Sequence, residues 1–78
     1  MISKNLSVLA YTNGFTMWHY KTGDTTEAVE SEGYFSPAAS IFNDGDMMFA
    51  SAAGEDGIET LAYYIRARGG EIALRRRT

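Results

Sequence analysis

Hydrophobic and polar residues alternate with a period of two near the start of the chain. Residues 6–11 alternate before the dipeptide Asn13-Gly14, and residues 15–20 alternate after it. A period of two is that of a β-strand, and Asn-Gly tolerates the positive φ angles of a type I′ turn. The pattern therefore predicts a β-hairpin over residues 6–20. Both faces of its second strand are bulky, with Phe15, Met17 and His19 on one face and Thr16, Trp18 and Tyr20 on the other.

Two helix-start signals follow this hairpin. Asp24 and Glu27 fit a capping box, in which each side chain satisfies a free backbone N–H, and they predict a short helix over residues 25–30. Ser36 followed by Pro37 predicts a second helix with Ser36 as its N-cap, because the missing N–H of proline costs nothing at the first helical position.

Three glycine- and polar-rich segments divide the rest of the chain. Asn43-Asp44-Gly45 is expected to end the second helix, and the apolar run after it predicts a buried strand over residues 46–51. Residues 52–57 are expected to form a turn.

Residues 58–68 fit two structures. As a helix, Asp56 and Glu59 would form another capping box. As a strand, this segment would pair with residues 71–75 across the two-residue loop Gly69-Gly70. The hairpin is favoured because a single turn at Gly69-Gly70 explains the residue types on both faces and pairs Arg68 with Glu71. Its core face would hold Tyr63, Ile65, Ala67, Ile72 and Leu74, and its outer face Tyr64, Arg66, Arg68, Glu71 and Arg75.

These elements predict one domain over residues 1–78, of mainly β (α+β) class. Seventy-eight residues are near the lower size for a self-supporting core, and the 45% hydrophobic content is enough to build one. We expect a small, partly open five-strand barrel or bent sheet. One or two short helices would lie between its second and third strands.

Charge is distributed unevenly along the chain. Residues 1–65 carry nine acids and two lysines, a net charge of −7, whereas residues 66–78 carry five arginines and one glutamate, a net charge of +4. The acidic body disfavours nucleic-acid binding, because it repels polyanions. The arginines could contact an acidic neighbour, including a second copy of the chain.

The sequence predicts no catalytic, metal or cofactor site. It has no cysteine, and His19 is its single histidine, so a zinc site lacks ligands. Serine, histidine and aspartate are present, but no nucleophile elbow accompanies them. Asp44 and Asp46 begin a row of carboxylates that runs into Met47 and Met48, rather than closing with the glutamate of a calcium loop. We therefore expect a protein that is not an enzyme.

No apolar run reaches the length of a signal peptide or the ~20 residues of a membrane span. This predicts a cytoplasmic protein with no membrane partner.

One series of short motifs resembles a known pattern. It consists of residues 18–24 (Trp-His-Tyr-Lys-Thr-Gly-Asp), then Gly33-Tyr34-Phe35, Ala39, Ile41 and Gly45-Asp46. The series is similar to a pattern in small uncharacterised β-rich proteins of alphaproteobacterial and bacteriophage genomes. It covers about residues 9–51, and the C-terminal third departs from it. The resemblance implies a β-rich module that is often encoded near phage structural genes, and a virion-associated location as an alternative. It implies no activity.

The chain carries more large apolar groups than one face of so small a sheet can bury, which predicts an exposed patch at an interface. We expect a structural or protein-interaction module of phage or prophage origin, with a protein partner or a second copy. The alternative is a small barrel that binds nucleic acid or a ligand. The candidate interaction residues are Trp18, Tyr20, Lys21, Tyr64, Arg66, Arg68 and Arg75.

Overall fold

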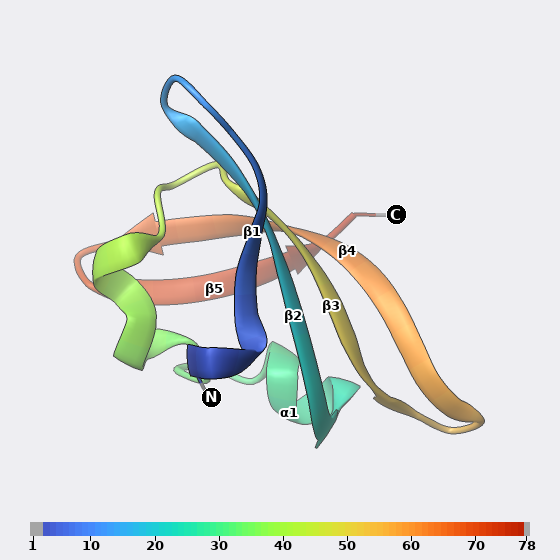
Figure 1. The fold of residues 1–78 in the computed structure, drawn as a ribbon. Coiled ribbons are helices and arrows are strands. Elements are labelled where there is room, and N and C mark those ends of the chain that lie inside the picture. The colour runs from blue at the N-terminus through green and yellow to red at the C-terminus, as the bar shows by residue number, and fades with distance from the viewer. Residues whose placement is uncertain (1–2, 78) are drawn as a thin grey trace.

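The computed structural model describes residues 3–77, which form one five-strand sheet and a layer of short helices (Figure 1). The strands lie in the sheet in their order along the chain. β2 and β3 pair in parallel, and the other neighbours pair antiparallel. The elements are η1 (Ser3–Asn5), β1 (Leu6–Thr12), β2 (Phe15–Thr25), α1 (Thr26–Glu30), η2 (Ser36–Ile41), β3 (Met47–Gly54), β4 (Gly57–Arg68) and β5 (Glu71–Arg76).

The predicted class, a mainly β domain with short helices between the second and third strands, is confirmed. The sheet stays open and does not close into a barrel. The first hairpin is also confirmed, but its predicted turn type is wrong. Gly14 has a φ of 81° and Asn13 has no positive φ, which is the φ pattern of a type II turn rather than type I′.

The parallel pairing of β2 with β3 requires the chain to cross from one end of the sheet to the other, and residues 26–46 make this crossover. The predicted caps in it are wrong by one residue. Thr25 caps α1 by accepting from the N–H of Ala28 at 3.1 Å, and Asp24 accepts from the hydroxyl of Tyr34. Ser36 lies inside η2, which follows Phe35 without a side-chain cap.

The C-terminal half is a meander of three strands. The predicted strand 46–51 is β3, which extends to Gly54, so the turn to β4 is shorter than expected. The alternative of a helix over residues 58–68 is wrong, because this segment is part of β4. The predicted second hairpin is confirmed in register, with Arg68 opposite Glu71. Gly69 and Gly70 both have positive φ, as a type I′ turn requires.

The core lies between the helices and one face of the sheet. A chain of edge-to-face aromatic contacts links β2 to the crossover: Trp18 meets Phe42 at a centroid distance of 5.1 Å, and Tyr20 meets Phe35 at 5.0 Å. Phe35 and Phe42 meet each other at 5.8 Å. The buried hydrophobic residues are Trp18, Tyr20, Val29, Phe35, Ala38, Phe42, Met48, Ala50, Ala52, Tyr63, Ile65 and Ile72.

Asp46 is a fully buried acid at the point where the crossover enters β3. Its carboxylate accepts from the backbone N–H of Thr16 (3.1 Å), the indole N–H of Trp18 (3.1 Å) and the backbone N–H of Asn43 (3.0 Å). Its carbonyl accepts from the N–H of Ile65 at 2.7 Å. One residue therefore ties together β2, the end of the crossover and β4.

Two further groups of hydrogen bonds fasten the helical layer to the sheet. Glu30 accepts from the hydroxyl of Tyr63 and from Nε of Arg76, both at 2.6 Å. Tyr34 donates to the carboxylate of Asp24 at 2.6 Å, and its hydroxyl lies 3.0 Å from that of Tyr20. The hydrogen bond from Arg76 lowers the pKa of Glu30. Burial, followed by the hydrogen bond to the neighbouring carboxylate, raises the pKa of both Tyr34 and Tyr63.

Replacing Asp46 with alanine should lower the free energy of unfolding by about 3 kcal/mol or more, because three N–H donors lose their acceptor in the core. Asp44→Ala is the matched control in the same turn. Asp44 is exposed and accepts from the N–H of Ala67 at 2.9 Å, so its loss should cost about 1 kcal/mol or less. Urea titrations measure both, and equal losses would contradict the role given to Asp46.

Stability should fall at both ends of the pH scale. Ionised Glu30 contributes stability above its ordinary pKa of 4.5, and this is lost as the pH falls through the lower pKa of the folded state. The neutral hydroxyls of Tyr34 and Tyr63 contribute stability below pH 10.0. This stability is lost as the pH rises further, because these tyrosines ionise at a lower pH in the unfolded chain than in the folded protein. Melting temperatures across the pH range measure both limbs.

The alkaline limb should be shallower in Tyr63→Phe, which has no hydroxyl to ionise at this site. Tyr11→Phe is the control, since Tyr11 is 69% exposed at the edge of the sheet, and its profile should match that of the unaltered protein. An alkaline limb unchanged by Tyr63→Phe would refute this explanation.

Candidate interaction surface

One face of the sheet carries no second layer among residues 3–77, because α1 and η2 both pack on the opposite face (Figure 1). We call this uncovered side the open face. Strand alternation and the pairing registers define its members. Its large or charged side chains are Phe15, Met17, His19, Lys21, Met47, Phe49, Ile58, Tyr64, Arg66, Arg68, Glu71 and Arg75.

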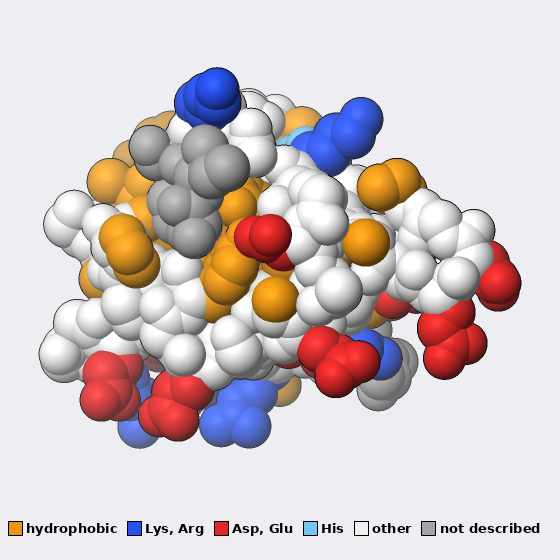
Figure 2. Space-filling view, turned by 90° about the horizontal axis from the view of Figure 1, so that it is seen from below, with side chains coloured by type: hydrophobic (Ala, Val, Ile, Leu, Met, Phe, Trp, Pro, Cys, Tyr) orange, Lys and Arg blue, Asp and Glu red, His pale blue; other side chains and the backbone are white. Residues whose placement is uncertain are grey.

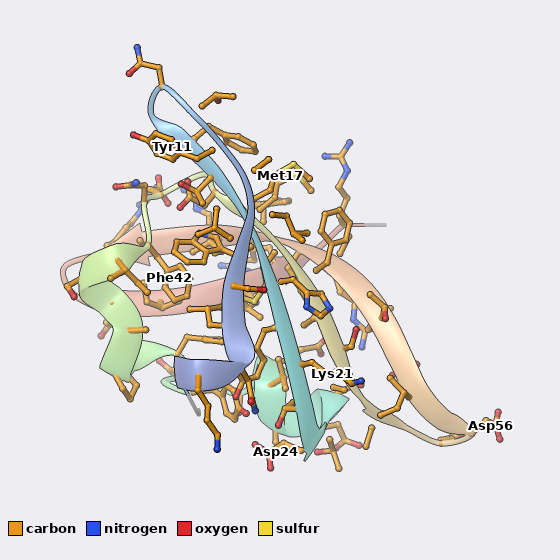
Figure 3. All side chains as sticks on the ribbon, in the orientation of Figure 1. Tyr11, Met17, Lys21, Asp24, Phe42 and Asp56 are labelled. Atoms are coloured by element: carbon orange, nitrogen blue, oxygen red, sulfur yellow. The ribbon has the colours of Figure 1, made fainter. Side chains whose placement is uncertain are left out.

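An apolar row crosses the open face from β2 to β4. Met17 pairs with Met47, Met47 with Tyr64, and Tyr64 with Arg75, so the four side chains stand side by side on one surface. The two methionines are half-buried, and Tyr64 is 39% exposed. In Figure 3, Met17 and Lys21 lie on the opposite side of the hairpin from Tyr11 and Phe42. The row offers adaptable apolar contact area that a partner could cover.

Beside this row, β4 and β5 form a shallow groove of about 460 Å³. Three guanidinium groups line it, against one carboxylate from Glu71. Arg66 also lies 3.7 Å from Asp44 at the rim, with both side chains exposed, so this ion pair leaves the guanidinium accessible. The residues of the groove are Tyr64, Arg66, Arg68, Glu71, Ala73 and Arg75.

The polar side chains at the centre of the open face bind one another. Nε2 of His19 lies 3.2 Å from Oγ of Ser51, which in turn lies 2.7 Å from Oγ1 of Thr60. The three residues come from β2, β3 and β4. These hydrogen bonds link the three strands across the open face, where His19 is half-buried.

The opposite side of the molecule is acidic. Four acids follow one another from the end of β2 to just after α1: Asp24, Glu27, Glu30 and Glu32. In the view from below (Figure 2), acidic side chains lie near the centre, along the lower edge and at the right-hand end, with Lys and Arg side chains among them along the lower edge. The basic groove and the acidic crossover are therefore on different faces of the sheet.

The structure brings together four of the candidate interaction residues: Tyr64, Arg66, Arg68 and Arg75 all line the groove. Lys21 is exposed on the same face but two strands away. The expectation that Trp18 and Tyr20 belong to the interaction surface is corrected by their burial. They are 8% and 0% exposed and point to the helices, because strand alternation places them on the core face.

The candidate interaction residues omit several large members of the surface, among them Met17, Met47, Phe49 and Ile58. A signal for them was present, since both faces of residues 15–20 are bulky and only one can be buried. Sequence reasoning also missed the role of Asp46, which the sequence placed at the start of a buried strand without indicating partners for its carboxylate. Nothing in a linear pattern reveals that its carboxylate meets N–H groups thirty residues away.

Within residues 3–77, no three His, Asp or Glu side chains are grouped so that they could hold a metal ion. None of the helices in this part of the chain has the length and apolar character needed to cross a membrane. No protein-family model, curated protein or solved structure matches the chain.

Proposed function

We propose that this chain is a non-enzymatic protein-interaction module that binds an acidic partner protein on its open face. The observation that carries the proposal is the one-sided packing of the sheet. Helices cover one face, and the other leaves a row of methionines and Tyr64 half-exposed beside an arginine-lined groove. Apolar patches with polar margins are typical of protein-binding surfaces.

The composition of the surface supports a protein partner. Tyr64 and the arginines are residue types enriched at interfaces, and methionine adapts to irregular partner surfaces. His19, Ser51 and Thr60 satisfy one another within the face, so covering them leaves few polar groups without a partner. A binding role therefore fits these side chains with little desolvation cost.

Charge determines the kind of partner that we propose. Arg66, Arg68 and Arg75 outnumber Glu71 in the groove, so carboxylates on the partner would be attracted and basic groups repelled. Two copies of this chain stacked open face to open face would bring like charges together. The proposed occupant is therefore a different, acidic protein.

The phage or prophage origin of this module is part of the proposal, and it rests on the sequence resemblance over residues 9–51. A structural role in a virion, or an accessory role in its assembly, would use the same open face. The virion-associated location follows the same reasoning, with a cytoplasmic location as the alternative.

Selection from a random peptide library displayed on yeast tests the proposed surface. We expect enriched peptides to combine Asp and Glu with at least one large apolar residue, which would lie against Tyr64. Arg66→Glu with Arg75→Glu should weaken binding of a selected peptide about tenfold or more, because both changes repel its carboxylates. Isothermal titration measures the affinity.

Lys4→Glu is the control for a change of charge away from the groove, since Lys4 is exposed on η1. It should leave the affinity within about twofold of that of the unaltered protein. Enrichment of basic peptides, or equal losses in the groove and control variants, would refute the acidic-partner proposal.

The alternative, a small barrel that binds nucleic acid or a ligand, relied on Trp18, Tyr20, Lys21 and the terminal arginines, and both Trp18 and Tyr20 are buried. Tyr64 with the groove arginines is the surface that would remain for it. We expect no saturable binding of single- or double-stranded DNA at ~0.15 M salt, because the acidic body opposes the arginines. Fluorescence anisotropy measures this. Sub-micromolar binding that weakens with added salt would favour the alternative.

A further inference from the structure

β5 forms one edge of the sheet, and no strand within residues 3–77 pairs with its outer side. Alternate residues of an antiparallel strand bond to the neighbour on each side. Arg77 donates its N–H to the carbonyl of Ala62 at 2.9 Å, so the odd-numbered residues of this segment bond to β4. The N–H and C=O groups of Ile72 and Leu74 therefore point outward, and no hydrogen bond within residues 3–77 uses them.

The sequence of β5 is complementary to itself when two copies run in opposite directions. The strand begins with Glu71 and carries Arg75 on the same face. Between these charges, Ile72 and Leu74 lie symmetrically on either side of Ala73. A second strand of this same sequence, running antiparallel, would therefore meet acid with base and apolar with apolar.

A two-fold axis perpendicular to the sheet places two copies of one edge strand antiparallel. It sets residues of the same face opposite one another, because it keeps each face of the sheet on its own side. With the axis at Ala73, Glu71 of each copy faces Arg75 of the other on the open face. On the core face, Ile72 faces Leu74, and their outward N–H and C=O groups bond to one another in both directions.

This alignment also suits the remaining arginines. Arg76 faces Gly70, which has no side chain to disturb the 2.6 Å contact between Arg76 and Glu30. Moving the axis by one residue toward the C-terminus would instead set Ile72 against Arg76. No two arginines of β5 stand directly opposite one another in the favoured alignment, so the basic end of the strand does not oppose the pairing.

We propose that β5 is a self-association edge, on which a second copy of this chain docks in an antiparallel two-fold dimer. Charge selects the occupant. Glu71 and Arg75 are both exposed at the ends of the paired segment, and an incoming strand must carry the same two charges in the same order to match both. Leu74 is half-buried at this edge, so the second copy would also cover apolar surface.

The pairing joins the two sheets into one, with both open faces on the same side. Glu71, Ala73 and Arg75 line the groove of each copy and lie along the axis. The two grooves would therefore meet in one continuous surface. The dimer forms without an acidic partner, so it does not depend on the function proposed above.

Sedimentation equilibrium of the full chain, with no peptide present, tests the proposal at concentrations up to about 1 mM. The unaltered protein should approach twice its chain mass of 8.6 kDa and dissociate on dilution. Glu71→Arg and Arg75→Glu should each remain at one chain mass, because each sets like charges opposite one another. An equimolar mixture of these two variants should dimerise, since the acids of one then face the arginines of the other.

Lys21→Glu is the control for a change of charge on the open face away from this edge. Lys21 is exposed on β2, and the dimer of this variant should persist. A single variant that dimerises alone, a mixture that stays at one chain mass, or a control that dissociates equally would each overturn the proposal.

Hydrogen exchange of the unaltered protein gives a second readout that needs no variant. The amides of Ile72 and Leu74 should exchange at least several-fold more slowly at high than at low protein concentration, because they gain acceptors in the dimer. The amides of β1, at the other edge, should be unaffected. Exchange at Ile72 and Leu74 that is independent of concentration, in a protein that stays monomeric throughout, would also overturn the proposal.

Discussion

The carboxylate of Asp46 fixes the position where β3 begins beside β2. Parallel neighbours cannot be joined by a tight turn, so the chain must leave the sheet, cross over and return to the same end. At the point of return, Asp46 accepts N–H groups from the backbone of β2, the indole of Trp18 and the crossover itself. Burying a carboxyl group without hydrogen-bond partners costs free energy, and these three donors meet Asp46 in only one alignment of β3 with β2. This requirement sets the register of the parallel pair.

The same crossover explains why the molecule is one-sided. Residues 26–46 return across one face, where α1, η2 and their aromatic rings cover the core. Residues 3–77 supply no layer on the other face, which keeps its side chains at the surface. Met17, Met47 and Tyr64 are bulky because strands favour such residues on both faces. Within residues 3–77, the open face therefore follows from the single crossover, which covers only the opposite face of the sheet.

Charge is distributed unevenly over the surface of the protein. The arginines of β4 and β5 line one groove and continue onto the β5 edge of the sheet. β1, at the other edge, is free of charge. Glu30 holds Arg76 on the helix side, so this one arginine of the C-terminal segment serves the fold rather than the surface.

The sequence by itself determined the local elements. Period-two alternation, Asn13-Gly14 and Gly69-Gly70 located both hairpins, and the second register followed from pairing Arg68 with Glu71. It also indicated that residues 15–20 could not bury both faces. Only the tertiary structure decided which face was buried, that β2 and β3 run parallel, and that Trp18 and Tyr20 point inward. These outcomes depend on contacts between residues about thirty positions apart, such as Asp46 with Thr16, and no local pattern encodes such a contact.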